Sequence, residues 1–302
     1  MKKNNSESSG LNRFSQMTTS DKVFYSIITV IGVLILFICI YPVWFVIIAS
    51  FSEPQQVTSG KVSFLPSLFT TDGYKEILNE TRIWIGYRNT IAYTVTGTLL
   101  SLAVTLPCAY ALSRKDFRIR NPLMVFFIIT MYFNGGLIPT YILITNYLHM
   151  NNTFWVMVIP FCLNVYNMIV CRTYFSSTIP DELLDAAIID GCSNFRFFMS
   201  VVLPLSKAII SVVMLYYIIG KWNEYFTALI YINDANLTTL QLVLRDILIR
   251  AETPTYVSDA AIRKEMLIKY TSIVVASVPV LILYPFLQKY FEKGVMIGSI
   301  KG

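Results

Sequence analysis

The sequence contains few charged residues. Only 14% of its 302 residues are Asp, Glu, Lys or Arg, whereas 55% are hydrophobic and the mean hydropathy is +0.58. Soluble domains carry about 25% charged residues, and a soluble chain of this length could not bury so much apolar surface. The composition excludes an ordinary soluble domain and predicts a protein that places apolar side chains against lipid.

Residues that serve metal and acid–base chemistry are also scarce. His149 is the sole histidine, and no two of the five cysteines are separated by only two residues. Neither a disulfide framework nor a zinc site is indicated, and a nucleophile–base constellation is missing, which disfavours a membrane enzyme. No glycine-rich P-loop motif occurs, so we expect no cofactor in this chain and no ATP hydrolysis by it.

The net charge of +6 comes from 24 Lys and Arg against 18 Asp and Glu. We do not expect a nucleic-acid partner, because membrane proteins hold Lys and Arg on their cytoplasmic side.

Residues 1–22 are polar, and the apolar stretch that follows is too long for the core of a signal peptide. We interpret them as a cytoplasmic tail before a retained first span.

Six apolar stretches reach the length of about 20 residues that a membrane span needs. They are residues 23–51, 89–112, 122–146, 153–175, 208–232 and 270–291. The predicted fold is an all-α integral membrane protein with six transmembrane helices in a domain of residues 23–291, and residues 292–302 form a second tail. Asn134-Gly135-Gly136 interrupts the third stretch, and such breaks persist at membrane depth only inside protein or beside a wet cavity.

Basic residues in the short loops predict the orientation. The loop after the second stretch holds four of them, and loop 147–152 has none. Because Lys and Arg stay in the cytoplasm, we expect the first loop inside and the second outside. Both termini then lie in the cytoplasm, loop 176–207 lies inside, and loops 52–88 and 233–269 lie outside.

The inner loop contains the signals of a short helix. Pro180 followed by Asp181 and Glu182 favours a helix start, and Gly191 suits the left-handed residue that closes a helix. An apolar stripe runs along this helix, but its polar face is acidic, which anionic lipid would repel. We therefore expect it to dock into a groove of a partner protein.

This inner loop resembles the EAA motif of ABC importer permeases, which runs Glu-Ala-Ala-x-x-Asp-Gly, a spacer and Leu-Pro. The matching residues are Asp185, Ala186, Ala187, Asp190, Gly191, Leu203 and Pro204. Asp replaces Glu at the first position, which keeps the charge. The resemblance implies a MetI-like permease fold in which loop 176–207 carries a coupling helix that sits in a cleft of the ATPase subunit.

Two further segments resemble carbohydrate-uptake permeases. Residues 133–140 are typical of the branch for oligosaccharides and complex sugars, and residues 288–302 resemble the end of such permeases. The second resemblance implies ATPase contacts at Gly294, Gly298 and Lys301. The family further implies a bacterial inner-membrane protein that forms a heterodimer with a homologous permease and assembles with two ATPase subunits and an external sugar-binding protein.

Polar and aromatic residues inside the spans are candidates for the substrate pathway. They are Asn134, Asn164, Asn167, Tyr217, Trp222, Asn223 and Glu224. Ionisable groups in lipid are usually functional, and aromatic faces can stack on sugar rings. The alternatives are that Lys221 pairs with Glu224, that the asparagines join helices and that the aromatics form interfacial belts.

These observations predict the permease subunit of an ATP-driven importer that moves an oligosaccharide from an external binding protein to the cytoplasm. The alternative is a self-contained, ion-coupled secondary transporter. Such transporters often show inverted internal repeats and ionisable residues at the membrane midplane. The sequence shows no convincing repeat, and its spans contain few acids.

Overall fold

The chain is helical throughout the part that the structure describes. The computed structural model describes the backbone of residues 18–252 and 259–299, and the side chains of residues 18–251 and 262–282. Within these ranges the only extended pairing is a single antiparallel bridge between Ser52 and Phe69. The all-α architecture predicted from the sequence is confirmed.

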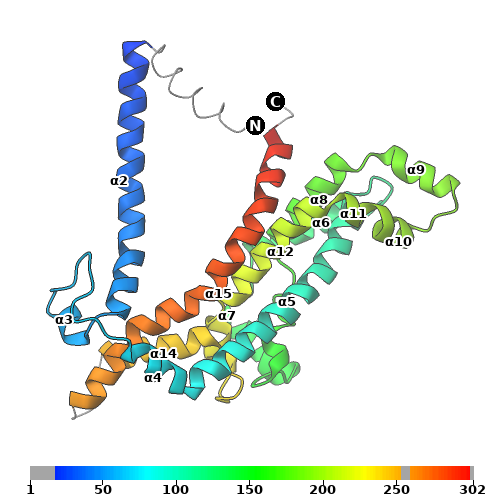
Figure 1. Ribbon diagram of the computed structural model, residues 1–302. Coiled ribbons are helices and arrows are strands. Elements are labelled where there is room, and N and C mark those ends of the chain that lie inside the picture. Colours follow the sequence, from blue (N-terminus) through cyan, green and yellow to red (C-terminus); the bar gives the residue numbers. More distant parts are fainter. Residues whose placement is uncertain (1–17, 253–258, 300–302) are drawn as a thin grey trace.

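The first long helix, α2 (Thr19–Ser50), leans away from the rest of the bundle and packs against it near its C-terminal end (Figure 1). Its most apolar window is 0% buried, while Ile48, Ala49 and Ser50 are buried. Its 32 residues rise about 48 Å at about 1.5 Å each, which exceeds the bilayer core of about 30 Å. This helix matches the first predicted span, and its bare apolar sides suit contact with lipid.

Four helices form the centre of the bundle. They are α5 (Thr81–Ser113), α8 (Val165–Thr178), α12 (Lys207–Trp222) and α15 (Asp259–Ser299). α5 packs against α8 and α12, and α12 packs against α15. The second predicted span lies within α5, which begins eight residues earlier, at Thr81 rather than residue 89.

A helix that the sequence analysis missed crosses α5. α14 (Leu240–Glu252) lies in the predicted outer loop 233–269 and packs on α5 and α15. Its apolar residues recur at helical spacing and bury one face, but its charges kept it below the hydropathy of a span. α5 approaches it closely at Gly86, where a Cβ would lie 2.9 Å from the Leu240 Cα.

The predicted third span is broken into two helices. α6 (Arg120–Tyr132) is separated by residues 133–136 from α7 (Leu137–Ile142), which continues into one π-helical turn, η1 (Leu143–Tyr147). The two parts meet at 107°. The interruption predicted at Asn134-Gly135-Gly136 is confirmed, because Asn134 Oδ1 accepts the Gly136 N–H at 3.0 Å and Gly136 has φ +84°.

The predicted fourth span, 153–175, is not one continuous helix. It consists of the 3-10 turn η2 (Phe154–Met157), irregular chain and then the 14-residue helix α8. Pro160 lacks the N–H that a continuing helix needs, and Phe161 has φ +63°. Asn164 then starts α8 by accepting the Asn167 N–H at 3.0 Å. At about 1.5 Å per residue α8 alone is too short to span the membrane.

The predicted fifth span, 208–232, also has the wrong end. α12 stops at Trp222, and a separate short helix, α13 (Phe226–Tyr231), follows. One helical rod precedes α12. It consists of α10 (Asn194–Phe197), the π-helical turn η3 (Phe198–Val202) and α11 (Leu203–Leu205). This rod meets α12 at 84°.

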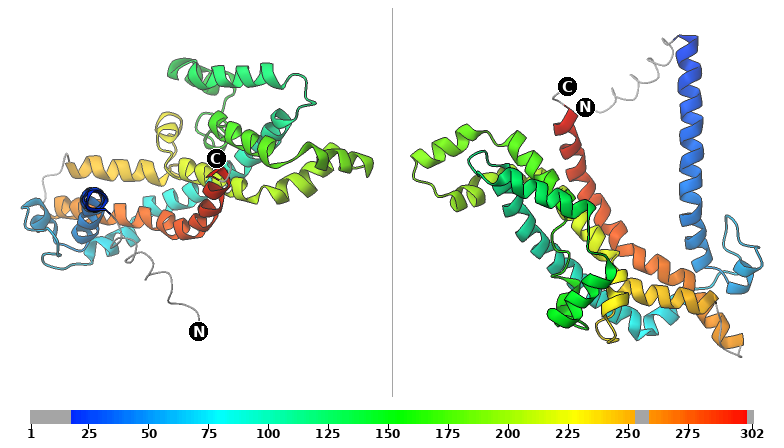
Figure 2. Two further views of the ribbon diagram at one scale, coloured as in Figure 1. Left: turned by 90° about the horizontal axis from the view of Figure 1, so that it is seen from above. Right: turned by 180° about the vertical axis from the view of Figure 1, so that it is seen from behind.

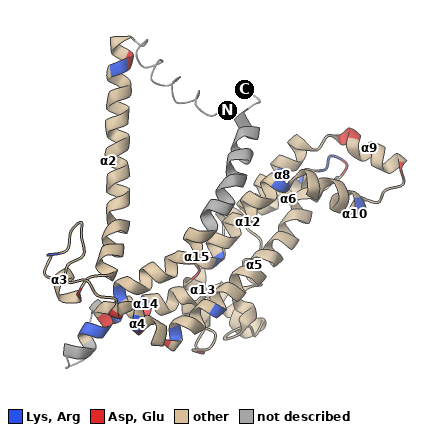
Figure 3. Cartoon of the chain, in the orientation of Figure 1, with Lys and Arg blue, Asp and Glu red and all other residues tan. Residues whose placement is uncertain are grey.

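The sixth predicted span, 270–291, lies within the longer helix α15. In the described part of the chain, three helices are long and apolar enough to cross a membrane, and up to five spans result if each bent pair counts as one. The count of six is compatible with this and stays a prediction. Figure 3 shows why the spans stand out, since Lys, Arg, Asp and Glu gather towards the ends of the long helices.

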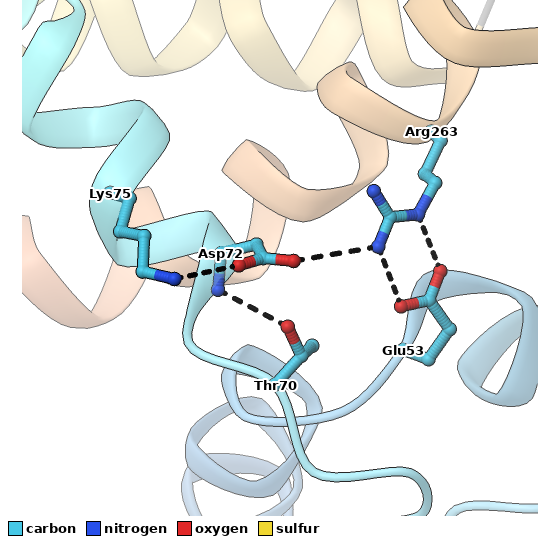
Figure 4. Close-up of polar contacts among 5 residues, drawn as sticks. All are labelled: Glu53, Thr70, Asp72, Lys75 and Arg263. Carbon is cyan, nitrogen blue, oxygen red and sulfur yellow. Dashed lines mark hydrogen bonds and ion pairs between the residues drawn. The ribbon is translucent and has the colours of Figure 1, made fainter.

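Ion pairs lock the start of α15 to the segment after α2. Arg263 donates from Nε and Nη2 to the two carboxylate oxygens of Glu53, at 2.7 and 2.9 Å, and lies 3.6 Å from Asp72 (Figure 4). Asp72 begins α4 (Asp72–Asn79), and Glu53 precedes α3 (Pro54–Thr58). The pKa of the Asp72 carboxyl lies below its usual value, mainly because of the hydrogen bond from Lys75. Loop 52–88 is therefore a structured cap at this end.

The opposite end of the bundle carries three segments together. The N-terminal end of α2, the C-terminal end of α15 and the helix α9 (Asp181–Ile189) all lie at the end away from α3 and α4 (Figures 1 and 2). The inner loop and both ends of the helical bundle thus share one side, as the topology predicted from the sequence requires.

Candidate functional site

The predicted inner-loop helix exists and is α9. Pro180 is its N-cap residue, and Asp181 and Glu182 occupy its first turn, where the positive end of the helix dipole favours acids. Asp181 also accepts a hydrogen bond from Lys115 Nζ at 2.7 Å. This bond is the main reason why the pKa of the Asp181 carboxyl lies below its usual value. The ion pair joins α9 to the basic loop after α5.

Gly191 closes α9 as predicted. Its φ is +73°, in the left-handed region. The Cys192 N–H donates to the Ala187 carbonyl at 2.8 Å, and the Gly191 N–H donates to the Ile188 carbonyl at 3.0 Å. These two bonds are the pair that defines a Schellman closure. The chain therefore leaves the helix at a fixed angle, towards the rod formed by α10 and α11.

The apolar side chains around α9 divide into an anchoring set and an exposed set. Leu184 and Phe197 are buried in a hydrophobic cluster that includes residues of α5 and α8. Four large apolar residues remain exposed on α9 and α10, namely Leu183, Ile188, Ile189 and Phe195. We call these four residues the α9 apolar surface. Asp185 lies within α9 and Asp190 is its C-cap residue, and both are exposed, as is the small residue Ala186.

The rest of the predicted motif links α9 to the bundle. Ala187 packs partly buried against the cluster, and Leu203 packs at its edge. Leu203 and Pro204 begin α11, just before the 84° bend into α12. A short helical rod therefore connects α9 to α12, one of the central helices.

Four of the predicted pathway residues line one cavity of about 200 Å³ between η2, α8 and α12. They are Asn164, Asn167, Tyr217 and Glu224. Lys221 and Tyr216 line it as well, together with Phe161 and Thr227, which the sequence analysis did not single out. Phe161 lies in the irregular chain before α8 and has a left-handed backbone, a conformation that the residue type does not predict. Thr227 lies in α13, after the break at residues 223–225 that the sequence analysis did not predict.

The hydroxyl of Tyr217 holds the cavity wall together. It lies 2.6 Å from the Thr105 hydroxyl of α5 and accepts the Asn164 N–H at 3.2 Å. These bonds join three segments at the point where α8 begins. Tyr217 thus braces the wall of the cavity, whereas the Asn167 side-chain amide has no partner among the described residues.

The pairing of Lys221 with Glu224, considered from the sequence, is absent at ion-pair distance among the described residues. Lys221 Nζ instead donates to the Met157 carbonyl at 3.1 Å, and Glu224 Oε1 accepts the Thr227 N–H at 3.0 Å. Each charged group is held by a backbone group, Lys221 in the last turn of α12 and Glu224 within the break that follows.

The remaining predicted pathway residues lie elsewhere. Trp222 and Asn223 line a separate open groove of about 860 Å³ between α12, α14 and α15. Asn134 is exposed in the break between α6 and α7, where its side chain shapes the turn. Of the predicted C-terminal contact residues, Gly294 and Gly298 fall within α15, and Lys301 lies outside the described residues.

Apolar helices around a polar-lined cavity, with an amphipathic helix outside them that exposes apolar side chains, define a transport subunit of a membrane complex. Residues 83–297 match the family described as "Binding-protein-dependent transport system inner membrane component". The chain belongs to this family, the permease subunits of ABC importers.

Relatives extend the match over nearly the whole chain. The chain is 37% identical to the polygalacturonan/rhamnogalacturonan transport system permease protein YtcP of Bacillus subtilis, over 90% of this chain and 96% of that protein. It is 28% identical to the arabinooligosaccharides transport system permease protein AraQ of Halalkalibacterium halodurans, over 89% and 93%. A chain from the crystal structure of a bacterial ABC transporter that imports the acidic polysaccharide alginate aligns with a TM-score of 0.84 and 30% identity. The alignment covers 91% of this chain and 99% of that one. The MetI-like permease fold predicted from the inner-loop motif is confirmed.

Proposed function

We propose that this chain forms part of the path through which an oligosaccharide passes from an external binding protein to the cytoplasm. The names of its relatives support this, since YtcP, AraQ and the alginate importer all handle sugar polymers or oligomers. The cavity supports it too, because its amide, hydroxyl and aromatic side chains match the hydroxyls and flat faces of sugars.

We propose that the α9 apolar surface docks into a groove of the ATPase subunit and makes α9 the coupling helix. The observation that carries the proposal is a short helix closed at Gly191 that leaves Leu183, Ile188, Ile189 and Phe195 exposed outside the bundle. Adjacent acids add charge complementarity to a basic groove, which favours specific docking. Asp185, Ala186, Ala187, Asp190, Gly191, Leu203 and Pro204 then act as one coupling unit.

We propose that both termini lie in the cytoplasm with α9. Basic residues near α9 support this orientation, since Lys115 and Arg196 lie outside the spans at that end. Gly294, Gly298 and Lys301 would then end α15 on the side where the ATPase binds. The test is the labelling of single cysteines. We expect cysteines at residues 191 and 301 to be labelled only after the membrane is permeabilised, and cysteines at residues 151 and 236 to be labelled from outside. Labelling of residue 191 from outside would refute it.

We propose that the working complex contains this chain, a homologous second permease, two ATPase subunits that bind the ATP, and an external sugar-binding protein. The two bent spans expose many apolar residues to the outside of this chain, among them Phe133 and Ile138 of the α6–α7 break. Such surfaces suit a permease partner or lipid.

The test is reconstitution of the purified complex in vesicles with the binding protein and radiolabelled oligosaccharide. We expect uptake that needs ATP, the binding protein and both permeases. Uptake by this chain alone, driven by an ion gradient, would instead support a secondary transporter.

A further inference from the structure

Lys221 is the cation of the cavity between η2, α8 and α12. Its aliphatic stem lies against α5 at Gly97, where a Cβ would lie 3.1 Å from the Lys221 Cε. The absence of a side chain at residue 97 therefore makes room for the stem. The ammonium group is held in the cavity wall by the Met157 carbonyl.

The ammonium group has hydrogen-bond donors to spare. It donates to the Met157 carbonyl at 3.1 Å, and an ammonium has three donors. No carboxylate oxygen of the described residues lies within 4.0 Å of it. Glu224 lies three residues further along, but its Oε1 accepts the Thr227 N–H. Glu224 lines the same cavity and attracts the ammonium group without contacting it. A lysine inside a span without a direct ion pair is costly and marks a functional site.

We propose that Lys221 binds a carboxylate of the passing substrate and that the substrate is an acidic, uronate-containing oligosaccharide. This inference rests on the proposed importer function. An ammonium–carboxylate hydrogen bond is stronger than a neutral one, and the Asn167 amide in the same cavity can bind sugar hydroxyls. Two of the similar proteins are named for acidic polymers, polygalacturonan and alginate.

The test compares two forms of one sugar in the reconstituted importer, a short oligogalacturonate and its fully methyl-esterified form. We expect Lys221→Gln to lower uptake of the acid relative to the ester about tenfold, since a bond to a charged group is lost. Lys221→Arg keeps the charge and should keep the preference. The binding protein is the same for both variants, so its own preference cancels in the ratio.

Two further variants separate contact from general effects. Gly97→Ala places a methyl group against the Lys221 stem, and it should reduce the acid preference without removing a charge. Arg245→Gln removes a cation from the other groove, and it should leave the preference unchanged.

The inference is overturned if Lys221→Gln reduces uptake of both sugars to the same extent. It is also overturned if Arg245→Gln reduces the preference for the acid as much as Lys221→Gln does. If the wild-type complex imports both sugars at equal rates and Lys221→Gln does the same, the importer function stands and the role of Lys221 falls. If the wild-type complex imports neither sugar, the acidic substrate class is refuted, whereas the proposed importer function is refuted only if ATP-dependent oligosaccharide uptake fails in its own test.

Discussion

Replacing Gly191 tests whether the closure of α9 controls coupling. The position is open, because a Cβ there would meet no atom within 4 Å. The cost of a side chain therefore comes from the backbone alone, which has φ +73°. A left-handed conformation costs an ordinary residue about 1–2 kcal/mol, and a β-branched residue is among the least suited to it.

A free-energy change of this size alters the ratio of closed to open helix ends by a factor of about 5–30. In Gly191→Val the Schellman bonds from Cys192 and Gly191 should break in most molecules, and the chain should leave α9 in another direction. Gly191→Asn is the matched control, since asparagine tolerates the left-handed region. The membrane bundle is untouched in both variants.

The assay is binding-protein-stimulated ATP hydrolysis measured together with uptake in the same vesicles. We expect Gly191→Val to insert normally but to bind the ATPase weakly or to hydrolyse ATP without matching uptake, and Gly191→Asn to stay near wild type. Asp190→Lys should weaken ATPase binding by reversing a charge beside the α9 apolar surface. Wild-type uptake per ATP in both Gly191→Val and Asp190→Lys would refute the role of α9.

Three further predictions concern packing, pH and the C-terminal segment. Gly86→Ala should lower the thermal stability of the purified chain by about 1–3 kcal/mol, typical of overpacking, because the new Cβ meets Leu240 backbone at 2.9 Å; an unchanged melting temperature would contradict this. The Lys115–Asp181 bond lowers the folded-state pKa of Asp181. Its contribution to holding α9 in place is therefore present above the ordinary carboxyl pKa and is lost as the pH falls through the lower folded-state pKa. ATPase binding by Asp181→Asn should therefore equal wild type only in acid and fall below it at neutral pH. Deletion of residues 294–302 should leave insertion intact and lower uptake, and unchanged uptake would refute an ATPase contact there.

The sequence predicted best those features that one or two residues determine locally. Gly191 was predicted to end a helix in the left-handed conformation, and Asn134-Gly135-Gly136 was predicted to interrupt one. Both predictions are confirmed. The low charge of 14% predicted the membrane class, and the apolar stretches of span length predicted its helical architecture.

Features that depend on tertiary packing were not predictable. α14 falls below the hydropathy of a span, so a search for spans placed it in a loop, although it packs one apolar face on α5. Pro160 marks the break after Met157, whereas the left-handed backbone of Phe161 and the end of α12 at Trp222 have no signal in any single residue type. The cavity joins residues from η2, α8 and α12, and only the fold brings these together.

The central claim is that α9 contacts the ATPase subunit, and photo-crosslinking tests it most directly. Ile189 is 86% exposed on the α9 apolar surface, and Leu65, at the opposite end of the bundle, is 76% exposed. A photoreactive amino acid at residue 189 should crosslink to the ATPase subunit in the assembled complex, and the same group at residue 65 should not. Absence of the crosslink from residue 189 in a complex that hydrolyses ATP and imports sugar would contradict the account.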